Sequence, residues 1–285
     1  MQKESIMNYK IVMDSCGELP AEKKESAKFE LIPLTLMVDE IQIVDDKTFD
    51  QKDFIKKVAA SPNCPKSSCP SPERYLQAYE GGYDCVFVVT LSEQLSGSYN
   101  SAMLGKKLFE ETNKDTKVYV FNSRSASVGQ TQIAYKVEEL AEQGVTFEEI
   151  VEQVEVFITE MDTYFVLETL ETLRKNGRLT NLQAIIANVL SIKPVMGATL
   201  DGNICKLDQV RGINKALTRM AEIIIKNVKD PEQKRLMISH CNCPERAELV
   251  EKMILSKISV KETVILDTAG VSTMYANDGG VIVTI

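Results

Sequence analysis

Small hydroxyl residues stand at two predicted helix starts, one within residues 67–72 (Ser-Ser-Cys-Pro-Ser-Pro) and one within residues 95–102 (Leu-Ser-Gly-Ser-Tyr-Asn-Ser-Ala). In the first segment we expect Ser71 to be the N-cap and Pro72 the first helical residue, because a hydroxyl caps and proline has no N–H to leave unpaired. The second segment follows the apolar run 85–91, which predicts a buried parallel strand. Such helix starts direct unpaired N–H groups and hydroxyls at one point. The two segments therefore predict a site for a carboxylate or a phosphate.

These serines also fit less specialised roles. Ser96 and Ser98 could only cap a helix, although a capping hydroxyl can also face a ligand. The stretch 123–127, Ser-Arg-Ser-Ala-Ser, looks like the loop of a serine nucleophile, but the chain has no G-x-S-x-G motif. Its only histidine, His240, lies in a different segment, so the partner that a serine hydrolase needs is missing. We therefore predict no catalytic residue.

The potential metal ligands lack the spacing of a metal site. Cys241 and Cys243 form one close pair, without a second pair at zinc spacing. Asp14, Asp45 and Asp46 supply carboxylates that could hold Mg²⁺. The last two fall in a predicted turn, however, where solvated charge is the expected state. We predict neither a metal nor a cofactor.

The composition excludes several classes of protein. The chain of 285 residues, 44% of them hydrophobic, is long for one core, so two domains are expected. A net charge of -8 gives no basic surface for nucleic acid. The longest apolar runs have strand length, so no membrane-spanning helix is expected, and the polar start 1–8 lacks the apolar core of a signal peptide. Seven cysteines without a framework spacing are typical of reduced thiols, which predicts a cytoplasmic protein.

The first half of the chain alternates strands and helices. The predicted strands are 9–15, 31–38 (interrupted by Pro33), 85–91 and 117–123, and a helix is predicted over about 129–142. Another helix should begin after Thr146, because Thr146 and Glu149 have the spacing of a capping box. Three strands finish in Ser15, Thr90 and Ser123. The carboxyl ends of parallel strands lie at one edge of a sheet, where ligands bind, so these polar ends should converge.

The second half has a different order of elements. The predicted strands are 164–167, 192–199, 204–210, 235–239, 263–266 and 281–285, and the predicted helices are 170–175, 182–190, 214–227 and 244–257. Asp201-Gly202 is a favoured hairpin turn and should pair 192–199 with 204–210. We therefore predict an α/β fold of two domains, with a parallel sheet in residues 1–160 and a mixed sheet in residues 161–285.

Seven short motifs follow one another along the chain. They are Ile-Val-Met-Asp-Ser-Cys-Gly-Glu-Leu-Pro (11–20), the segments 67–72 and 95–102, Ser-Arg-Ser-Ala-Ser with a glycine (123–129), Leu-Arg-Lys-Asn-Gly-Arg (173–178), Ile-Lys-Pro (192–194) and Val-Arg-Gly (210–212). Each motif alone is weak, but seven in this order are highly specific. They resemble the DegV family of bacterial lipid-binding proteins, and the resemblance runs from about Tyr9 to Ile285.

The resemblance implies a two-domain α/β protein that holds one long-chain fatty acid between its domains. In bacteria with the matching kinase, members of this family present the carboxyl group to a separate, ATP-dependent fatty acid kinase subunit, which makes an acyl phosphate. The protein itself would be a carrier and not an enzyme. The apolar stretch 182–190 could then be buried core, or it could line an acyl tunnel.

The resemblance also implies site residues. Ser67 and Ser96 match the carboxylate-binding hydroxyl positions of the family, and Gly97 would let the backbone approach the ligand closely. Arg211 matches a basic position near the ligand head or on the kinase-facing surface. The chain departs from the family at Asn277, where a histidine is usual, and an amide cannot be a cation. Further departures are Cys16, Gly17 and Cys69.

Three functions compete on this evidence. The leading one is fatty-acid binding, because burial of about 14 methylenes at roughly 0.8 kcal/mol each gives about 11 kcal/mol before ordering costs. The second is an enzyme that acts on a small anionic or hydroxylated substrate at the same cleft, although the acid/base partner and the phosphate-binding loop are missing. The third is a regulatory protein that responds to lipid occupancy.

Overall fold

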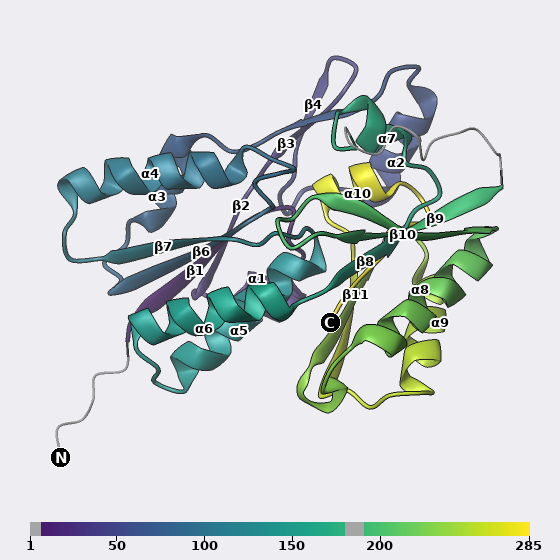
Figure 1. The fold of residues 1–285 in the computed structure, drawn as a ribbon. Coiled ribbons are helices and arrows are strands. Elements are labelled where there is room, and N and C mark those ends of the chain that lie inside the picture. Colours follow the sequence, from purple (N-terminus) through teal and green to yellow (C-terminus); the bar gives the residue numbers. More distant parts are fainter. Residues whose placement is uncertain (1–6, 180–190) are drawn as a thin grey trace.

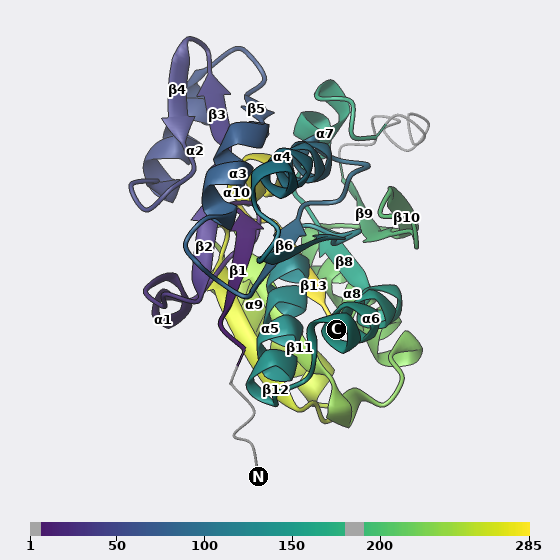
Figure 2. The same cartoon turned by 90° about the vertical axis from the view of Figure 1, so that its left-hand side faces the viewer.

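The computed structural model describes residues 7–179 and 191–285. The stretch 182–190, predicted as a helix, lies outside the described residues. The described chain contains three separate sheets, with helices between and around them (Figures 1 and 2). The predicted α/β fold, with a parallel N-terminal sheet and a mixed C-terminal sheet, is confirmed.

The N-terminal sheet consists of four parallel strands. In spatial order these are β2 (Phe29–Ile32), β1 (Tyr9–Asp14), β6 (Cys85–Thr90) and β7 (Lys117–Asn122). Every residue of β1 and β6 is buried, because helices cover both faces of the sheet. The apolar run predicted as a buried parallel strand is therefore confirmed, and it is a central strand.

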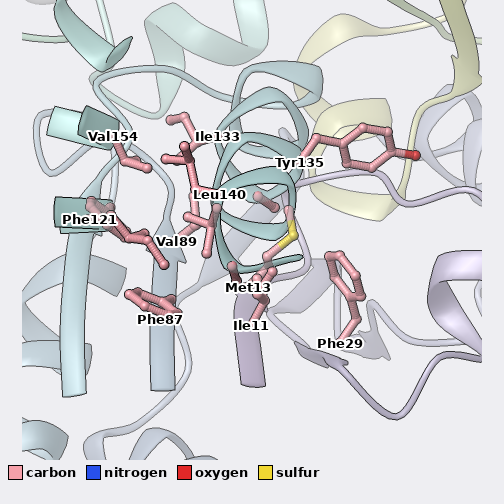
Figure 3. Close-up of a cluster of buried hydrophobic side chains, with 14 of the residues drawn as sticks. Ile11, Met13, Phe29, Phe87, Val89, Phe121, Ile133, Tyr135, Leu140 and Val154 are labelled. Atoms are coloured by element: carbon pink, nitrogen blue, oxygen red, sulfur yellow. The ribbon is translucent and has the colours of Figure 1, made fainter. Parts of the chain in front are cut away.

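Two pairs of helices cover this sheet (Figure 1). One face carries α3 (Pro72–Tyr79) and α4 (Ser98–Thr112), and the other carries α5 (Val128–Glu142) and α6 (Phe147–Glu160). Successive side chains of β1 alternate between the faces. Ile11 and Met13 pack toward α5, as Figure 3 shows, whereas Val12 packs under α3 and α4.

The C-terminal sheet is mixed. In spatial order its strands are β10 (Ile204–Arg211), β9 (Ile192–Ala198), β8 (Thr163–Val166), β13 (Val281–Thr284), β11 (Arg235–His240) and β12 (Glu262–Asp267). Only β11 and β12 pair in parallel. Helices α8 (Ile213–Asn227) and α9 (Pro244–Leu255) pack on its outer face.

Helix α5 lies between the two large sheets. It contacts β1 and β6 of the N-terminal sheet and β11 and β13 of the C-terminal sheet. Twelve of its fifteen residues are buried, which a helix exposed on one side could not achieve. The described chain is thus layered as helices, sheet, helices, sheet and helices (Figure 2).

A smaller antiparallel sheet corrects one prediction. Residues 31–38 were expected to form one strand interrupted by Pro33, but β2 ends at Ile32 and β3 (Thr35–Val38) belongs to another sheet. Proline has no N–H to donate to a neighbouring strand, which disfavours continued pairing in the parallel sheet past Ile32. The small sheet has the order β4 (Ile41–Val44), β3 and β5 (Lys66–Ser68).

The remaining elements are short or lie near this small sheet. They are α1 (Ala21–Lys24), α2 (Gln51–Ala60), α7 (Glu171–Lys175), a 3-10 helix (Pro231–Gln233) and α10 (Gly270–Ala276). The sequence analysis did not predict α2 or α10. Helix α10 contacts α2 of the N-terminal half and α7 of the C-terminal half, so it packs between elements of both halves.

Several local signals are confirmed. Thr146 and Glu149 form the capping box of α6. Ser71 is the N-cap of α3 with Pro72 next, although the Ser71 hydroxyl makes no capping hydrogen bond. Strands β9 and β10 form the predicted hairpin, and Gly202 in its turn has a φ of 81°, a conformation that glycine adopts without strain.

Three carboxylates that follow β1 or the small sheet are buried. Asp14 has no exposed surface, and Glu18 and Asp45 are 3% and 4% exposed. The prediction of solvated charge at Asp45 is therefore wrong, whereas Asp46 next to it is exposed. A carboxylate can be buried here because each receives hydrogen bonds, from main-chain amides or side chains.

Glu18 should make the stability of the protein depend on pH. Burial raises the pKa of this carboxyl from 4.5 to about 7, so the folded protein binds its proton more tightly than the unfolded chain does. The contribution of Glu18 to the free energy of unfolding is complete below pH 4.5 and is lost as the pH rises through about 7, a loss of about 3 kcal/mol.

Glu18→Gln mimics the neutral form. We expect its free energy of unfolding to rise relative to that of the parent protein between pH 5 and pH 8, as measured by urea denaturation. Glu22→Gln, an exposed change in the same segment, is the control. A difference between Glu18→Gln and the parent that stays constant over this range would contradict the assignment.

Candidate functional site

A cavity lies where β5 and the residue that follows it meet the start of α4. The start of α3, at Ser71 and Pro72, does not line it. The cavity has a volume of about 210 Å³, and we call it the polar cavity. It is lined by Leu34, Ser67, Ser68, Cys69, Leu91, Leu95, Ser96, Gly97, Arg178, Val271 and Tyr275. The structure thus brings Ser67, Ser96 and Gly97 together in one cavity, although they come from separate segments.

Ser67 is positioned by the small antiparallel sheet. It lies on β5, directly opposite Leu36 of the fully paired strand β3. Its hydroxyl oxygen is 3.3 Å from the phenolic oxygen of Tyr275, which α10 contributes. Burial raises the pKa of Tyr275, so the phenol is neutral and can donate or accept a hydrogen bond.

Ser96 and Gly97 are positioned by the start of α4. Gly97 is the N-cap, and the Ser96 hydroxyl oxygen accepts a hydrogen bond from the amide of Ser98 at 3.2 Å. The first turn of α4 contains no acidic residue, so the positive end of the helix dipole is not neutralised from within the helix. Gly97 is exposed, and an added Cβ would lie 3.1 Å from the sulfur of Cys69. This end of the cavity therefore suits an anion and is open to solvent.

Arg178 supplies positive charge to the same cavity. Among the described residues it is the one charged side chain that lines the polar cavity. Its Nε donates a hydrogen bond to the carbonyl of Leu95 at 3.0 Å, and Nη1 donates to the carbonyl of Asn176. The guanidinium lies 6.0 Å from the centre of the Tyr275 ring. These contacts hold the cation beside the two hydroxyl-bearing segments and leave further N–H groups for a ligand.

A second cavity, which we call the apolar cavity, continues from the first. The two share the lining residues Leu91, Leu95, Arg178, Val271 and Tyr275. Beyond them, the walls are built largely from apolar side chains of the C-terminal half, including Phe165, Leu167, Leu173, Ile204 and Ile282. The volume of this cavity is about 90 Å³. The pair of cavities has the shape of a polar mouth above an apolar channel.

The turn of the β9–β10 hairpin closes one side of the apolar cavity. The Ser92 hydroxyl donates to the carbonyl of Gly202 at 2.9 Å. A Cβ on Gly202 would lie 2.4 Å from the Ser92 oxygen and 2.7 Å from Cα of Arg124, so only glycine allows this approach. The hairpin of the C-terminal sheet is thereby fastened to loops of the N-terminal sheet.

The serines of 123–127 serve this loop structure. The Ser123 hydroxyl donates to the carbonyl of Ser125 at 3.0 Å, and the Ser125 hydroxyl lies 2.7 Å from that of Thr163. Ser127 donates to Glu18 at 2.8 Å. These hydrogen bonds tie the loop to Thr163 of β8 and to Glu18.

Two residues assigned from the family resemblance are not among the lining residues of either cavity. Arg211 is exposed at the end of β10. Asn277 ends α10, where its Nδ2 donates to the carbonyl of Tyr275 at 3.0 Å and its Oδ1 accepts from Thr172 at 3.2 Å. Neither lines the polar or the apolar cavity. Their contact with a ligand or partner stays a prediction.

Arg178 and Tyr275 line the polar cavity but were not predicted as site residues. Arg178 closes the motif 173–178, and a lone arginine directly after Asn-Gly was the available signal for a positioned cation. Tyr275 had no comparable signal, because it lies on a short helix that was not predicted. In residues 7–179 and 191–285, no group of three or more His, Cys, Asp or Glu side chains could hold a metal ion. In the same ranges, no helix is both long and apolar enough to cross a bilayer.

Known proteins share this fold and much of this sequence. A family model described as an uncharacterised protein of the DegV family matches residues 8–284. A DegV domain-containing protein of Streptococcus pneumoniae is 32% identical over 279 residues, which is 97% of this chain and 98% of that protein.

Solved structures add bound ligands. A DegV family protein of Ruminococcus gnavus, solved with vaccenic acid, is 49% identical with a TM-score of 0.95 and covers 99% of this chain and 100% of its own. The fatty acid kinase B3 protein of S. pneumoniae, loaded with linoleic acid, is 31% identical with a TM-score of 0.87 and covers 98% of this chain and 99% of its own.

Proposed function

This chain belongs to the DegV family, and from that premise we propose that it binds one long-chain fatty acid. The carboxylate lies in the polar cavity, between the hydroxyls of Ser67 and Ser96 and beside Gly97. The acyl tail lies in the apolar cavity. The protein is a carrier that performs no chemistry on its ligand, and we place it in the cytoplasm, where its seven free cysteines stay reduced.

The observation that carries this proposal is the joining of the two cavities. A small phosphorylated substrate would need polar groups around its whole surface, whereas the walls beyond Leu91 and Val271 are largely apolar. A fatty acid has one anionic end and a long apolar remainder, which is the division that the two cavities present. The similar proteins solved with vaccenic and linoleic acids support the same assignment.

The tail and the head contribute differently to binding. Burial of about 14 methylenes gives about 11 kcal/mol before ordering costs, so affinity comes mainly from the tail. A full tail needs more room than 90 Å³, so we expect the apolar walls to spread on binding. The carboxylate end fixes the orientation of the ligand, because the start of α4, which favours negative charge, lines the polar cavity and not the apolar one.

Native mass spectrometry of the purified protein, intact and then denatured, tests the proposal. We expect an added mass of about that of a fatty acid in the intact protein, lost on denaturation. A protein that carries no such mass, and takes up none from added oleic acid, would overturn the proposal. A retained phosphorylated metabolite would favour an enzyme at the same cleft.

We further propose that the bound carboxyl group is presented to a separate fatty acid kinase. Gly97 and Cys69 are exposed, so the carboxyl end of the site faces solvent. Similarity to the fatty acid kinase B3 protein supports this role. Arg211 lines neither cavity, so we propose that it contacts the kinase and not the carboxylate.

We place the domain boundary near residue 160, between α6 and β8.

Removal of either hydroxyl should weaken binding of the acid. Ser67→Ala or Ser96→Ala removes a hydrogen bond to a charged group, which costs about 1 to 3 kcal/mol, or roughly 5- to 150-fold in Kd. Titration calorimetry with oleic acid measures this change. Ser101→Ala, on α4 but outside both cavities, is the control and should bind as the parent does. An unchanged Kd for Ser96→Ala would mean that this hydroxyl only caps the helix.

Asn277→His tests the departure from the family. Asn277 lines neither cavity, so tail-driven affinity should change by less than about tenfold. If a cation here aids transfer, acyl-phosphate formation should rise when a kinase subunit and ATP are supplied. Both quantities are measured on one preparation, with Asn277→Ala as the uncharged control. Efficient phosphorylation by the parent, with no gain from histidine, would show that this position does not limit transfer.

A further inference from the structure

We infer that Asp45 is a positioning residue for the polar cavity. It sets the distance between the hydroxyl oxygens of Ser67 and Tyr275 and does not touch the ligand. This inference rests on the proposed function, because the quantity it changes is the affinity for a carboxylate. Asp45 is outside both the polar and the apolar cavity. Asp45 acts through the two elements that bear these hydroxyl groups, the helix α10 and the small antiparallel sheet.

The Asp45 carboxylate is fully engaged. Its Oδ1 accepts a hydrogen bond from the amide of Gly270 at 2.7 Å. Its Oδ2 accepts from the amide of Val271 at 2.9 Å and from the hydroxyl of Ser15 at 2.9 Å. Three donors from two distant parts of the chain thus converge on one side chain that is 4% exposed. Hydrogen bonds to a charged acceptor are the stronger kind, so this contact holds its donors firmly.

The first of these elements is α10, which bears Tyr275. The Asp45 carboxylate binds the main-chain amides at the N-terminus of α10. Gly270 and Val271 are the first two residues of this helix, and their amides would otherwise be unpaired. A Cβ on Gly270 would lie 2.5 Å from Oδ1 of Asp45, so the glycine permits the close contact. Val271 and Tyr275 are four residues apart and lie on one face of the helix. Both line the polar cavity, so the hold on the helix start also places the Tyr275 phenol.

The second element is the small antiparallel sheet, which bears Ser67. The Asp45 amide donates to the carbonyl of Leu34 at 2.9 Å, and the Leu34 amide donates to the Ser15 hydroxyl at 2.9 Å. Leu34 directly precedes β3, and β3 pairs with β5, where Ser67 lies. One residue therefore fixes both the strand that carries Ser67 and the helix that carries Tyr275, whose hydroxyl oxygens are 3.3 Å apart.

Asp45 also makes the start of α10 less favourable for an anionic ligand than the start of α4. Its carboxylate places negative charge at the N-terminus of α10, against the amides of Gly270 and Val271. The start of α4, with no acid in its first turn, remains positive. A ligand carboxylate is thus repelled from α10 and directed to Ser96 and Gly97.

Asp45→Asn is the test, because it keeps the size of the side chain but replaces one acceptor oxygen with an amino group. That group must face at least one of the three donors, so α10 or Ser15 has to move. We measure the Kd of oleic acid and of methyl oleate, which share a tail but differ in the head. We expect the Kd to increase about tenfold for oleic acid and less than threefold for methyl oleate. Asp46→Asn, on the exposed neighbour, should leave both unchanged.

A double-mutant cycle separates positioning from a general loss of structure. If Asp45 acts through Tyr275, the effects of Asp45→Asn and Tyr275→Phe on acid binding should not add. Equal weakening of acid and ester, or additive effects, would overturn the inference. A parent protein that binds neither ligand would instead overturn the proposed function.

A milder variant covers the case in which Asp45→Asn does not fold. Ser15→Ala removes one donor to Asp45 and the acceptor of the Leu34 amide, while both α10 amides keep their partner. We expect about a threefold increase in the Kd of oleic acid, with the ester unaffected. An unchanged acid affinity in a folded Ser15→Ala protein would overturn the inference.

Discussion

Two carboxylates from the N-terminal half, Asp45 and Glu18, hold the first amides of α10, and the geometry of the site depends on that contact. Burial of a carboxylate is unfavourable unless donors replace the lost water. Here the donors are the helix amides that would themselves be unpaired, so each group satisfies the other. Because α10 belongs to the C-terminal half in sequence, the same contact joins the two halves where both cavities lie.

The two halves contribute different chemistry to the site. The N-terminal half supplies the hydroxyls of Ser67 and Ser96 and the start of α4, all near the carboxyl ends of parallel strands, where ligands commonly bind. The C-terminal half supplies most of the apolar walls, from β8, the β9–β10 hairpin and α7. Helix α5 is enclosed between the two large sheets and contacts strands of both. A ligand with one charged end and a long tail matches this division.

Much of the fold could be predicted from local patterns. The run 85–91 is apolar throughout, as a central parallel strand must be, and Thr146 with Glu149 carries its own capping signal. Ser96, directly before α4, indicated the polar end of the site because helix starts have a strong preference for hydroxyls. These features depend on residues that are close in sequence. Ser67 lies on β5 instead, so its place in the site depends on strand pairing.

The predictions failed where contacts between residues far apart in the sequence determine the burial or the position of a side chain. Asp45 looks like a turn residue, and its burial depends on amides that lie 225 and 226 residues later. Tyr275 gains its position from a seven-residue helix that is too short to be stable alone and is held by those carboxylates. Arg178 was visible as a residue, but its place beside Tyr275 follows from the packing of α7 against α10.

The most direct measurement is a crystal structure of the protein with a long-chain fatty acid that carries bromine at the end of its tail. Anomalous scattering locates the bromine independently of the rest of the ligand. The account predicts the bromine in the apolar cavity, near Phe165 or Ile282, and the carboxylate within hydrogen-bond distance of Ser67 and Ser96. Bromine beside Ser67, or a ligand bound outside both cavities, would contradict it.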